Sequence, residues 1–171
     1  SGNGFTYPTA VVPAPDNQVL VLNWGMQHFT DNPVIDRRVS RWTLDEEFLG
    51  EFGNAQLTWA SGLGLDREGR VYCSDEHKHR IFIYSLDGEL LGQWGEPGPL
   101  AGQFNGPAGL AFDASDDLYV TDSQSDRVQK FTKDGEYLMG WGSSGTGPGQ
   151  LNSPWGITTD CKGDVYVADW A

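Results

Sequence analysis

The chain has 171 residues, with 24 acidic and 11 basic side chains and a formal net charge of −13 at pH 7. This charge repels phosphate, so the composition argues against a nucleic-acid partner. There is no apolar run long enough to cross a membrane, which predicts a soluble protein of unknown compartment. Its 23 Gly, 9 Pro and 7 Trp suit a fold with many tight turns and apolar packing between sheets.

The sequence is built from similar units that follow one another. The first two of these repeat units extend over residues 7–53 and 54–95. Each has a third strand that opens with Arg (RVSRW, 38–42; RIFIY, 80–84) and alternates apolar and polar residues, as half-buried strands do. A segment of the form Leu-Asp-x-Glu-x-Leu-Gly follows in both units and predicts the fourth strand.

Unit one differs from unit two by a long insertion. The end of its second strand and the Arg of its third strand are fifteen positions apart (23 to 38), against five (75 to 80) in unit two. The insertion, within residues 24–37, carries Trp24, Met26, His28 and Phe29. Long loops are tolerated at small cost and often carry function. Two interpretations stay open: the loop covers its own hydrophobic side chains, or it contacts a ligand or partner.

The third unit, residues 96–142, shows the complete pattern. Short strands are expected at 109–112, 118–121, 127–131 and 136–142, joined by turns rich in Asp, Gly and Ser. The fourth unit, residues 143–171, holds only the first two strands. Four short strands in each unit and no helical stretch predict an all-β propeller of four-stranded antiparallel blades, with three full blades and half of a fourth.

The repeat itself is long and regular. Residues 102–113 (GQFNGPAGLAFD) return 47 positions later at 149–160 (GQLNSPWGITTD), and a period of this length indicates a propeller or a solenoid. With the second strands VYCSD, LYVTD and VYVAD and the Arg-led third strands, these motifs resemble the NHL repeat family. The resemblance implies a six-bladed ring that binds ligands on the face with the loops between strands two and three.

The number of units also predicts how the blades are completed and packed. Propellers close with about four to eight blades, so we expect further blades from the rest of the chain or from another polypeptide. They would cover sheet edges that otherwise stay unpaired. Phe52, Trp94 and Trp141 share one position at the end of strand four, and each is predicted to pack between neighbouring blades.

Carboxylates close the second strands on the loop-bearing face. Asp75, Asp122 and Asp169 share this position, and a ring of carboxylates is a weak candidate for a calcium site. However, each precedes a tight turn, and the first two lie five positions before an Arg. Capping of turn amides or pairing with that Arg is therefore the favoured interpretation, and no cofactor is predicted.

Histidine and tryptophan supply two further candidates. His28, His77 and His79 are a possible zinc set, although a structural role in the turn is favoured for the last two. Trp155 breaks the repeat, because Ser61 and Ala108 stand at the equivalent positions. It should stand at the mouth of the central channel, either as a plug or as a ligand contact.

Two functions stay open. The favoured one is a non-catalytic platform for a protein or small-molecule ligand, contacted by Trp24, Met26, His28, Phe29 and Trp155. The alternative is a six-bladed propeller enzyme, a lyase or hydrolase with or without a metal. Resemblance to the peptidyl-hydroxyglycine amidating lyase implies zinc-binding histidines just after the proline that opens strand one. The matching positions hold Ser61, Ala108 and Trp155, so the sequence leans against catalysis.

Overall fold

The computed structural model describes residues 7–24 and 37–170, which form three four-stranded antiparallel sheets and one two-stranded sheet. The strands are β1 (Pro8–Ala14), β2 (Gln18–Asn23), β3 (Arg38–Thr43) and β4 (Phe48–Phe52); β5 (Ala60–Leu65), β6 (Val71–Asp75), β7 (Arg80–Tyr84) and β8 (Leu90–Trp94); β9 (Pro107–Phe112), β10 (Leu118–Asp122), β11 (Arg127–Phe131) and β12 (Tyr137–Trp141); and β13 (Gly156–Thr159) and β14 (Val165–Ala168). The helical content of these residues is one 3₁₀ turn, Ser123–Ser125, and no helix among them is long and apolar enough to cross a membrane. The predicted all-β fold of four-stranded antiparallel blades is confirmed.

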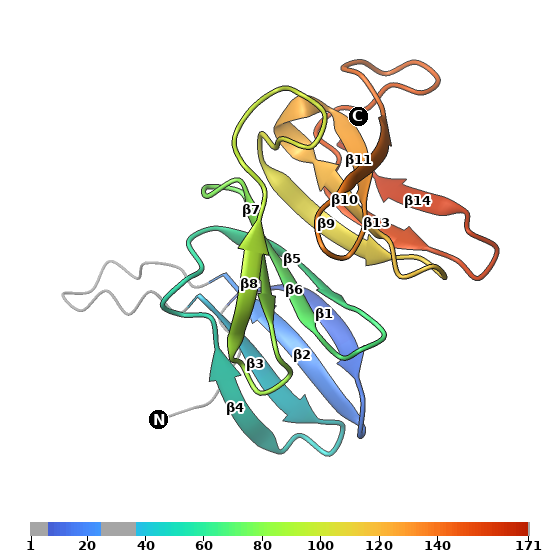
Figure 1. Ribbon diagram of the computed structural model, residues 1–171. Coiled ribbons are helices and arrows are strands. Elements are labelled where there is room, and N and C mark those ends of the chain that lie inside the picture. Colours follow the sequence, from blue (N-terminus) through green and yellow to red (C-terminus); the bar gives the residue numbers. More distant parts are fainter. Residues whose placement is uncertain (1–6, 25–36, 171) are drawn as a thin grey trace.

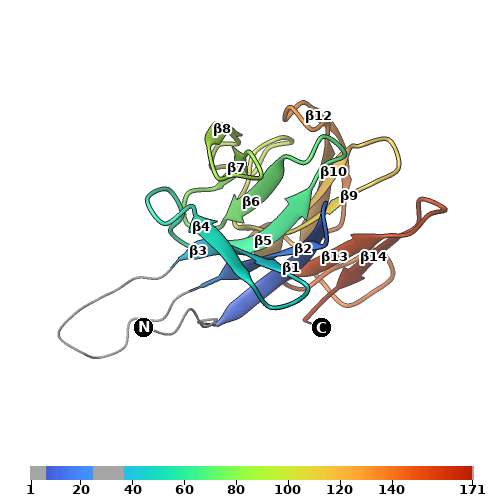
Figure 2. The ribbon, with the colours of Figure 1, turned by 90° about the horizontal axis from the view of Figure 1, so that it is seen from below.

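The sheets follow one another as blades around a shared inner wall. In each sheet the strands lie in sequence order, so the first strand is at one side and the last at the other. The first strands contact one another in turn, β1 with β5, β5 with β9 and β9 with β13 (Figures 1 and 2). Strands β4, β8 and β12 therefore lie on the outside.

Glycine allows the inner strands to approach closely. A Cβ atom on Gly62 would lie 2.0 Å from the carbonyl oxygen of Ala108, and one on Gly109 would lie 2.2 Å from that of Trp155. Both distances are far inside van der Waals contact, and the atom met is a backbone atom of the next blade. A side chain at either position would push neighbouring blades apart.

A hydroxyl on the second strand fixes this contact. Ser74 Oγ accepts a hydrogen bond from the Gly62 amide at 2.8 Å and donates one to the carbonyl of Ala108 in the next blade. Thr121 repeats the bridge one blade further on and donates to the carbonyl of Trp155 at 2.9 Å. The inner wall is thus held by hydrogen bonds between blades as well as by packing.

Aromatic rings fill the space between the outer parts of the blades. Phe52 is buried, and its ring centroid lies 5.2 Å from that of Tyr84 in the second blade. Trp94 occupies the same place one blade on, 4.9 Å from Phe131 of the third blade. The predicted packing between blades holds at these two positions.

The prediction is not tested for Trp141, because the described residues hold no third strand in the following blade. Its side chain is 36 % exposed, and its ring contacts Tyr119 of its own blade, with centroids 5.8 Å apart. The rings that cover Phe52 and Trp94 come from the third strand of the following blade. The fourth sheet consists of β13 and β14, so no third-strand ring reaches Trp141.

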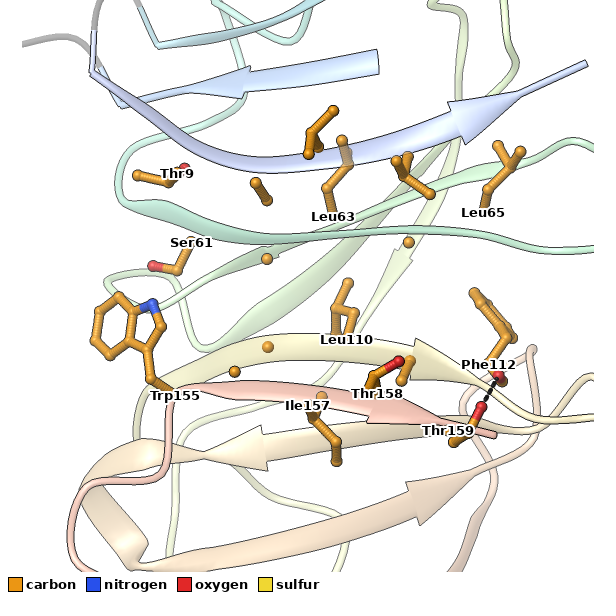
Figure 3. A pocket seen from close by; sticks show the side chains of 18 residues that line it. Thr9, Ser61, Leu63, Leu65, Leu110, Phe112, Trp155, Ile157, Thr158 and Thr159 are labelled. Carbon is orange, nitrogen blue, oxygen red and sulfur yellow. Dashed lines mark hydrogen bonds between the residues drawn. The ribbon is translucent and has the colours of Figure 1, made fainter. Parts of the chain in front are cut away.

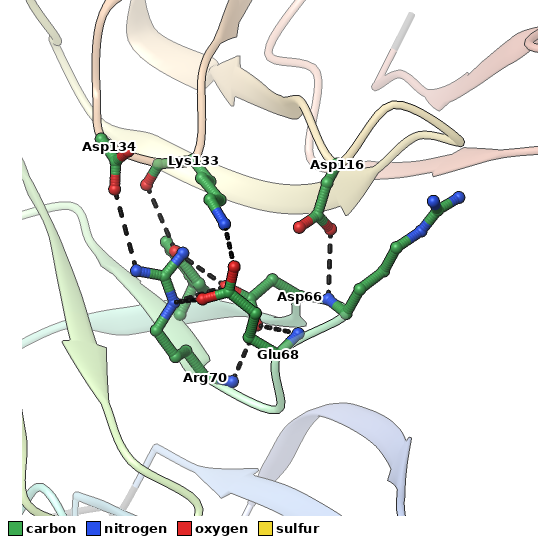
Figure 4. A network of polar contacts seen from close by, with 8 residues as sticks. Asp66, Glu68, Arg70, Asp116, Lys133 and Asp134 are labelled. Atoms are coloured by element: carbon green, nitrogen blue, oxygen red, sulfur yellow. Dashed lines mark hydrogen bonds and ion pairs between the residues drawn. The ribbon is translucent and has the colours of Figure 1, made fainter.

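Ion pairs join the second and third blades (Figure 4). They lie at the turns after β5 and β11, and the loops between strands two and three lie at the other ends of these strands. Arg70 pairs with the buried carboxylate of Asp66 at 2.6 Å and approaches Asp134 of the third blade at 3.7 Å. Lys133 Nζ pairs with Glu68 across the same boundary. These contacts join the two blades across their boundary, with Glu68 and Asp134 largely exposed.

Candidate functional site

The inner strands enclose a groove with a volume of about 440 Å³. Strands β1, β5 and β9, together with Trp155 and β13 just after it, supply its walls. Figure 3 shows Thr9, Ser61 and Trp155 at one end of the groove, and Phe112 and Thr159 at the other. Between the two ends, the apolar side chains of Leu63, Leu110 and Ile157 line the groove together with glycines of the inner strands.

Trp155 stands at the end of this groove and is held there by its backbone. Its amide donates to the carbonyl of Ala168 at 2.9 Å, and its own carbonyl accepts from Thr121 Oγ1. The indole remains 39 % exposed. It lines both the groove and a second cavity, so it stands where the two meet.

The second cavity, called the mouth cavity below, has a volume of about 540 Å³. Its lining consists of Glu76, Ser123, Gln124, Ser153, Trp155 and Trp170. These residues come from the loops between strands two and three, from the connection into β13 and from the residues after β14. The Trp170 side chain is 76 % exposed, and its amide donates to the carbonyl of Asn152 at 3.1 Å.

Glu76 is the acidic group of the mouth cavity. Its amide donates to the carbonyl of Trp59 at 3.0 Å, and its Oε1 accepts a hydrogen bond from Ser61 Oγ. Burial raises the pKa of the Glu76 carboxyl; the Ser61 hydrogen bond opposes this, and the charge of Asp75 adds to it. The site therefore holds a carboxylate that has lost part of its hydration.

Sequence reasoning did not select Glu76 or Trp170. Both directly follow the Asp of the second-strand motif (Asp75 and Asp169), and the other units have Trp24 and Ser123 at the same position. The register is the same in each case, as shown by the pairs Asp75–Arg80 and Asp122–Arg127. Comparing the four units at this one position would have found both residues, because architecture is repeated and this position varies.

Replacing Glu76 by Gln is expected to stabilise the protein at pH 7. The raised pKa means that the folded state binds the proton more tightly than the unfolded state, so ionised Glu76 opposes folding above its folded pKa. This penalty disappears as the pH falls below the unfolded value of about 4.3. Thermal unfolding should give a higher Tm for Glu76→Gln at pH 7 and a smaller difference at about pH 4. Glu89→Gln, at an exposed position, is the control, and a lower Tm for Glu76→Gln at pH 7 would contradict the expectation.

The three calcium candidates each hold the connection into strand one of their own blade, and Asp75 also caps the turn after it by accepting the Lys78 amide at 3.0 Å. Each carboxylate accepts a backbone N–H from the connection into its blade's first strand: Asp75 from Trp59 at 3.1 Å, Asp122 from Asn105 at 2.7 Å, and Asp169 from Asn152 at 2.8 Å. Asp122 also pairs with Arg127 at 2.9 Å. Asp75 and Asp122 are fully buried. Their hydrogen bonds account for the carboxylate in each of these units without a bound ion.

The histidines of the possible zinc set have different surroundings. The His77 ring packs against Trp59, with centroids 5.4 Å apart. His79 has a φ of 54°, as turn residues do, while His28 lies outside the described residues. Within residues 7–24 and 37–170, no three His, Cys, Asp or Glu side chains come together as a metal site.

The insertion of unit one is described only at its ends. Trp24 directly follows β2; its amide donates to the carbonyl of Tyr7 at 3.0 Å, and its side chain is 41 % exposed. Trp24 is not among the residues that line the mouth cavity. The other three candidates in this loop, Met26, His28 and Phe29, lie outside the described residues.

Comparisons with known proteins agree with this architecture. The NHL repeat model matches residues 104–131 and 151–171, which confirms the resemblance to the NHL repeat family. No curated protein matches the sequence. Among solved structures, a streptogramin B lyase is 17 % identical with a TM-score of 0.69 and is matched over 96 % of this chain and 49 % of its own.

Two further solved structures show the same relation. A catalytically inactive variant of virginiamycin B lyase from Staphylococcus aureus with quinupristin is 15 % identical, with a TM-score of 0.69, over 99 % of this chain and 51 % of the lyase. The WD40 repeats of RRP9 are 16 % identical, with a TM-score of 0.64, over 92 % and 43 %. At this identity the likeness concerns the fold. The chain spans about half the length of each of these structures.

Proposed function

We propose that this chain, which carries NHL repeats on a propeller fold, is a non-catalytic binding module whose ligand enters the mouth cavity. One observation carries the proposal: the indoles of Trp155 and Trp170 and the carboxylate-bearing Glu76 line a single open cavity. Concave sites with aromatic walls and a few polar groups are the usual form of small-molecule sites, which measure roughly 300–1,000 Å³. The mouth cavity lies within that range.

Hydrogen bonds hold the backbone of Trp155 and the side chain of Glu76 in place. Trp155 is hydrogen-bonded through both its amide and its carbonyl, and Glu76 through its amide and one carboxylate oxygen. Positions that are already held lose little freedom when a ligand binds. This supports a platform whose backbone is set before binding.

Other indoles on connections of the same face extend the surface. Trp59, on the connection into β5, is 46 % exposed, and Trp24 is 41 % exposed. Tryptophan is enriched among the residues that contribute most to protein–protein binding. A segment of a protein partner can therefore also occupy the mouth cavity while its flanks contact these residues.

A ligand-observed NMR screen tests the proposal. The probe is a set of small molecules that contains aromatic compounds and organic cations, and saturation transfer is measured on the wild-type protein. We expect binding that is lost in the Trp155→Ala/Trp170→Ala double variant and kept in Trp141→Ala, which removes an equally exposed indole from the outer side of the third blade. Compounds that bind the double variant as well as the wild type would refute the mouth cavity as the site.

We also propose that further blades complete a six-bladed ring. Strand β14 pairs with β13 on one side, and Trp141 has no third-strand ring from the fourth sheet against it. The chain spans about half of the solved structures that it matches. Blades from the same polypeptide or from another would pair β14 and cover Trp141.

The enzymatic alternative has one observation in its favour. Ser61 Oγ donates to Glu76, a carboxyl with a raised pKa at a cavity, and such groups are candidates for general acid–base work. Mass spectrometry of each bound compound after incubation with the protein separates the two functions. Unchanged compounds support the binding module; a product that is absent with Glu76→Gln supports an enzyme.

A further inference from the structure

We infer that the mouth cavity selects an organic cation, an alkylammonium group held between the Glu76 carboxylate and the indoles of Trp155 and Trp170. The inference rests on the proposed function, since it names the ligand class of the same cavity. It follows from three properties of the residues that line the cavity: their charge, their aromatic rings and their hydrogen-bonding groups.

Glu76 is the single ionisable side chain among the six residues that line the cavity. Lys78, two positions after Glu76, is engaged elsewhere. Lys78 Nζ donates to the carbonyl of Gln56 and lies 5.3 Å from the centre of the Phe82 ring. Among the residues described, Glu76 therefore has no basic partner, and an incoming cation is the group that would neutralise it.

The indoles supply the second property. The face of a tryptophan ring carries negative electrostatic potential and attracts ammonium groups, and aromatic cages for quaternary ammonium ligands use this effect. The Trp155 and Trp170 side chains are both exposed and both line the cavity with Glu76. A carboxylate beside aromatic rings selects an organic cation over a neutral compound of the same shape.

The remaining lining residues agree with this ligand. Ser123, Gln124 and Ser153 carry side-chain oxygen atoms that accept hydrogen bonds, as an ammonium group or a hydroxyl on the ligand would require. The net charge of −13 also attracts cations to the protein from a distance. The charge at the cavity and the net charge of the whole protein therefore both favour a cation.

Isothermal titration calorimetry with three probes tests the inference. Choline is compared with 3,3-dimethylbutan-1-ol, which has nearly the same shape without the charge. It is also compared with Nα-acetyl-lysine amide, whose side-chain ammonium group is free. We expect choline to bind at least ten-fold more tightly than the neutral alcohol. Binding of the lysine compound as well would identify a lysine side chain of a protein as a second source of the same group.

Matched variants assign the charge to one residue. Glu76→Gln keeps the shape of the side chain and should weaken choline binding at least ten-fold while leaving the neutral alcohol unaffected. Glu89→Gln removes an exposed carboxylate outside the cavity and should change neither affinity. Circular dichroism confirms that the variants are folded.

The possible results separate this inference from the proposed function. Equal affinities for choline and the neutral alcohol would overturn the cation preference and leave a binding cavity in place. Undetectable binding of choline and of the lysine compound at millimolar concentration, with other compounds bound in the screen, would also overturn it. Loss of every compound's binding to the mouth cavity would refute the proposed function itself.

Discussion

Trp94→Ala is expected to lower the free energy of unfolding by about 2–4 kcal/mol, somewhat less than for a fully buried ring, because Trp94 is partly buried. The indole lies between the second and third blades, 5.9 Å from the ring of Phe104 and 4.9 Å from that of Phe131. Gly135 of the third blade lies directly against it, since a Cβ there would be 2.6 Å from the indole. The strands on both sides are fixed in their sheets, so the cavity left by the ring cannot collapse. Urea unfolding measures the loss.

Trp141→Ala provides a control at the equivalent position of the next blade. Trp141 is 36 % exposed and contacts one ring, that of Tyr119. The expected loss in the 171-residue chain is about 1–2 kcal/mol, smaller than for Trp94, because no ring of the following blade packs on Trp141 among the described residues. Equal losses for the two variants would show that Trp94 does not hold the blades together.

Gly62→Ala is expected to destabilise the protein by about 3 kcal/mol, the upper part of the usual range for overpacking. The added Cβ would lie 2.0 Å from the Ala108 carbonyl oxygen and 2.8 Å from Ser74 Oγ. Relief requires the second and third blades to separate, which also breaks the Ser74 bridge between them. Thermal or urea unfolding with the wild type alongside gives the value.

Gly92→Ala distinguishes the contact at Gly62 from a general effect of replacing a strand glycine. Gly92 lies in β8, and a Cβ there would meet no atom within 4 Å. This variant should be neutral or slightly stabilising, because alanine has less freedom to lose on folding. If both substitutions destabilised the protein to a similar degree, the close approach of the blades would not be the cause of the effect of Gly62→Ala.

The arrangement of the blades follows from the sequence because it is repeated there. Units two and three place their second strands and Arg-led third strands at the same spacing, and unit one keeps the same segments around its insertion, so each unit supports the assignment of the others. The ion pair of Asp122 with Arg127 follows for the same reason, since Arg127 stands five positions on in the repeat. The residue types and the repeat period are sufficient to predict these features.

The features that depend on neighbouring units were harder to predict. The exposure of Trp141 is set by the strands of the following blade rather than by its own sequence. The mouth cavity brings Glu76 together with Trp170, 94 positions later (170 minus 76), and with a residue before β13. Periodicity shows which positions face the same way, but the identity of the residues there changes from blade to blade.

The indole N–H signals of the seven tryptophans report directly on whether a ligand enters the mouth cavity. In ¹⁵N-labelled protein, assigned by single Trp→Phe variants, titration with a compound from the screen should shift the signals of Trp155 and Trp170. The signals of Trp42 and Trp94, which lie outside the cavity lining, should stay in place. Shifts at Trp42 or Trp94 with none at Trp155 and Trp170, at concentrations where the compound is bound, would contradict a ligand site at the mouth of the groove.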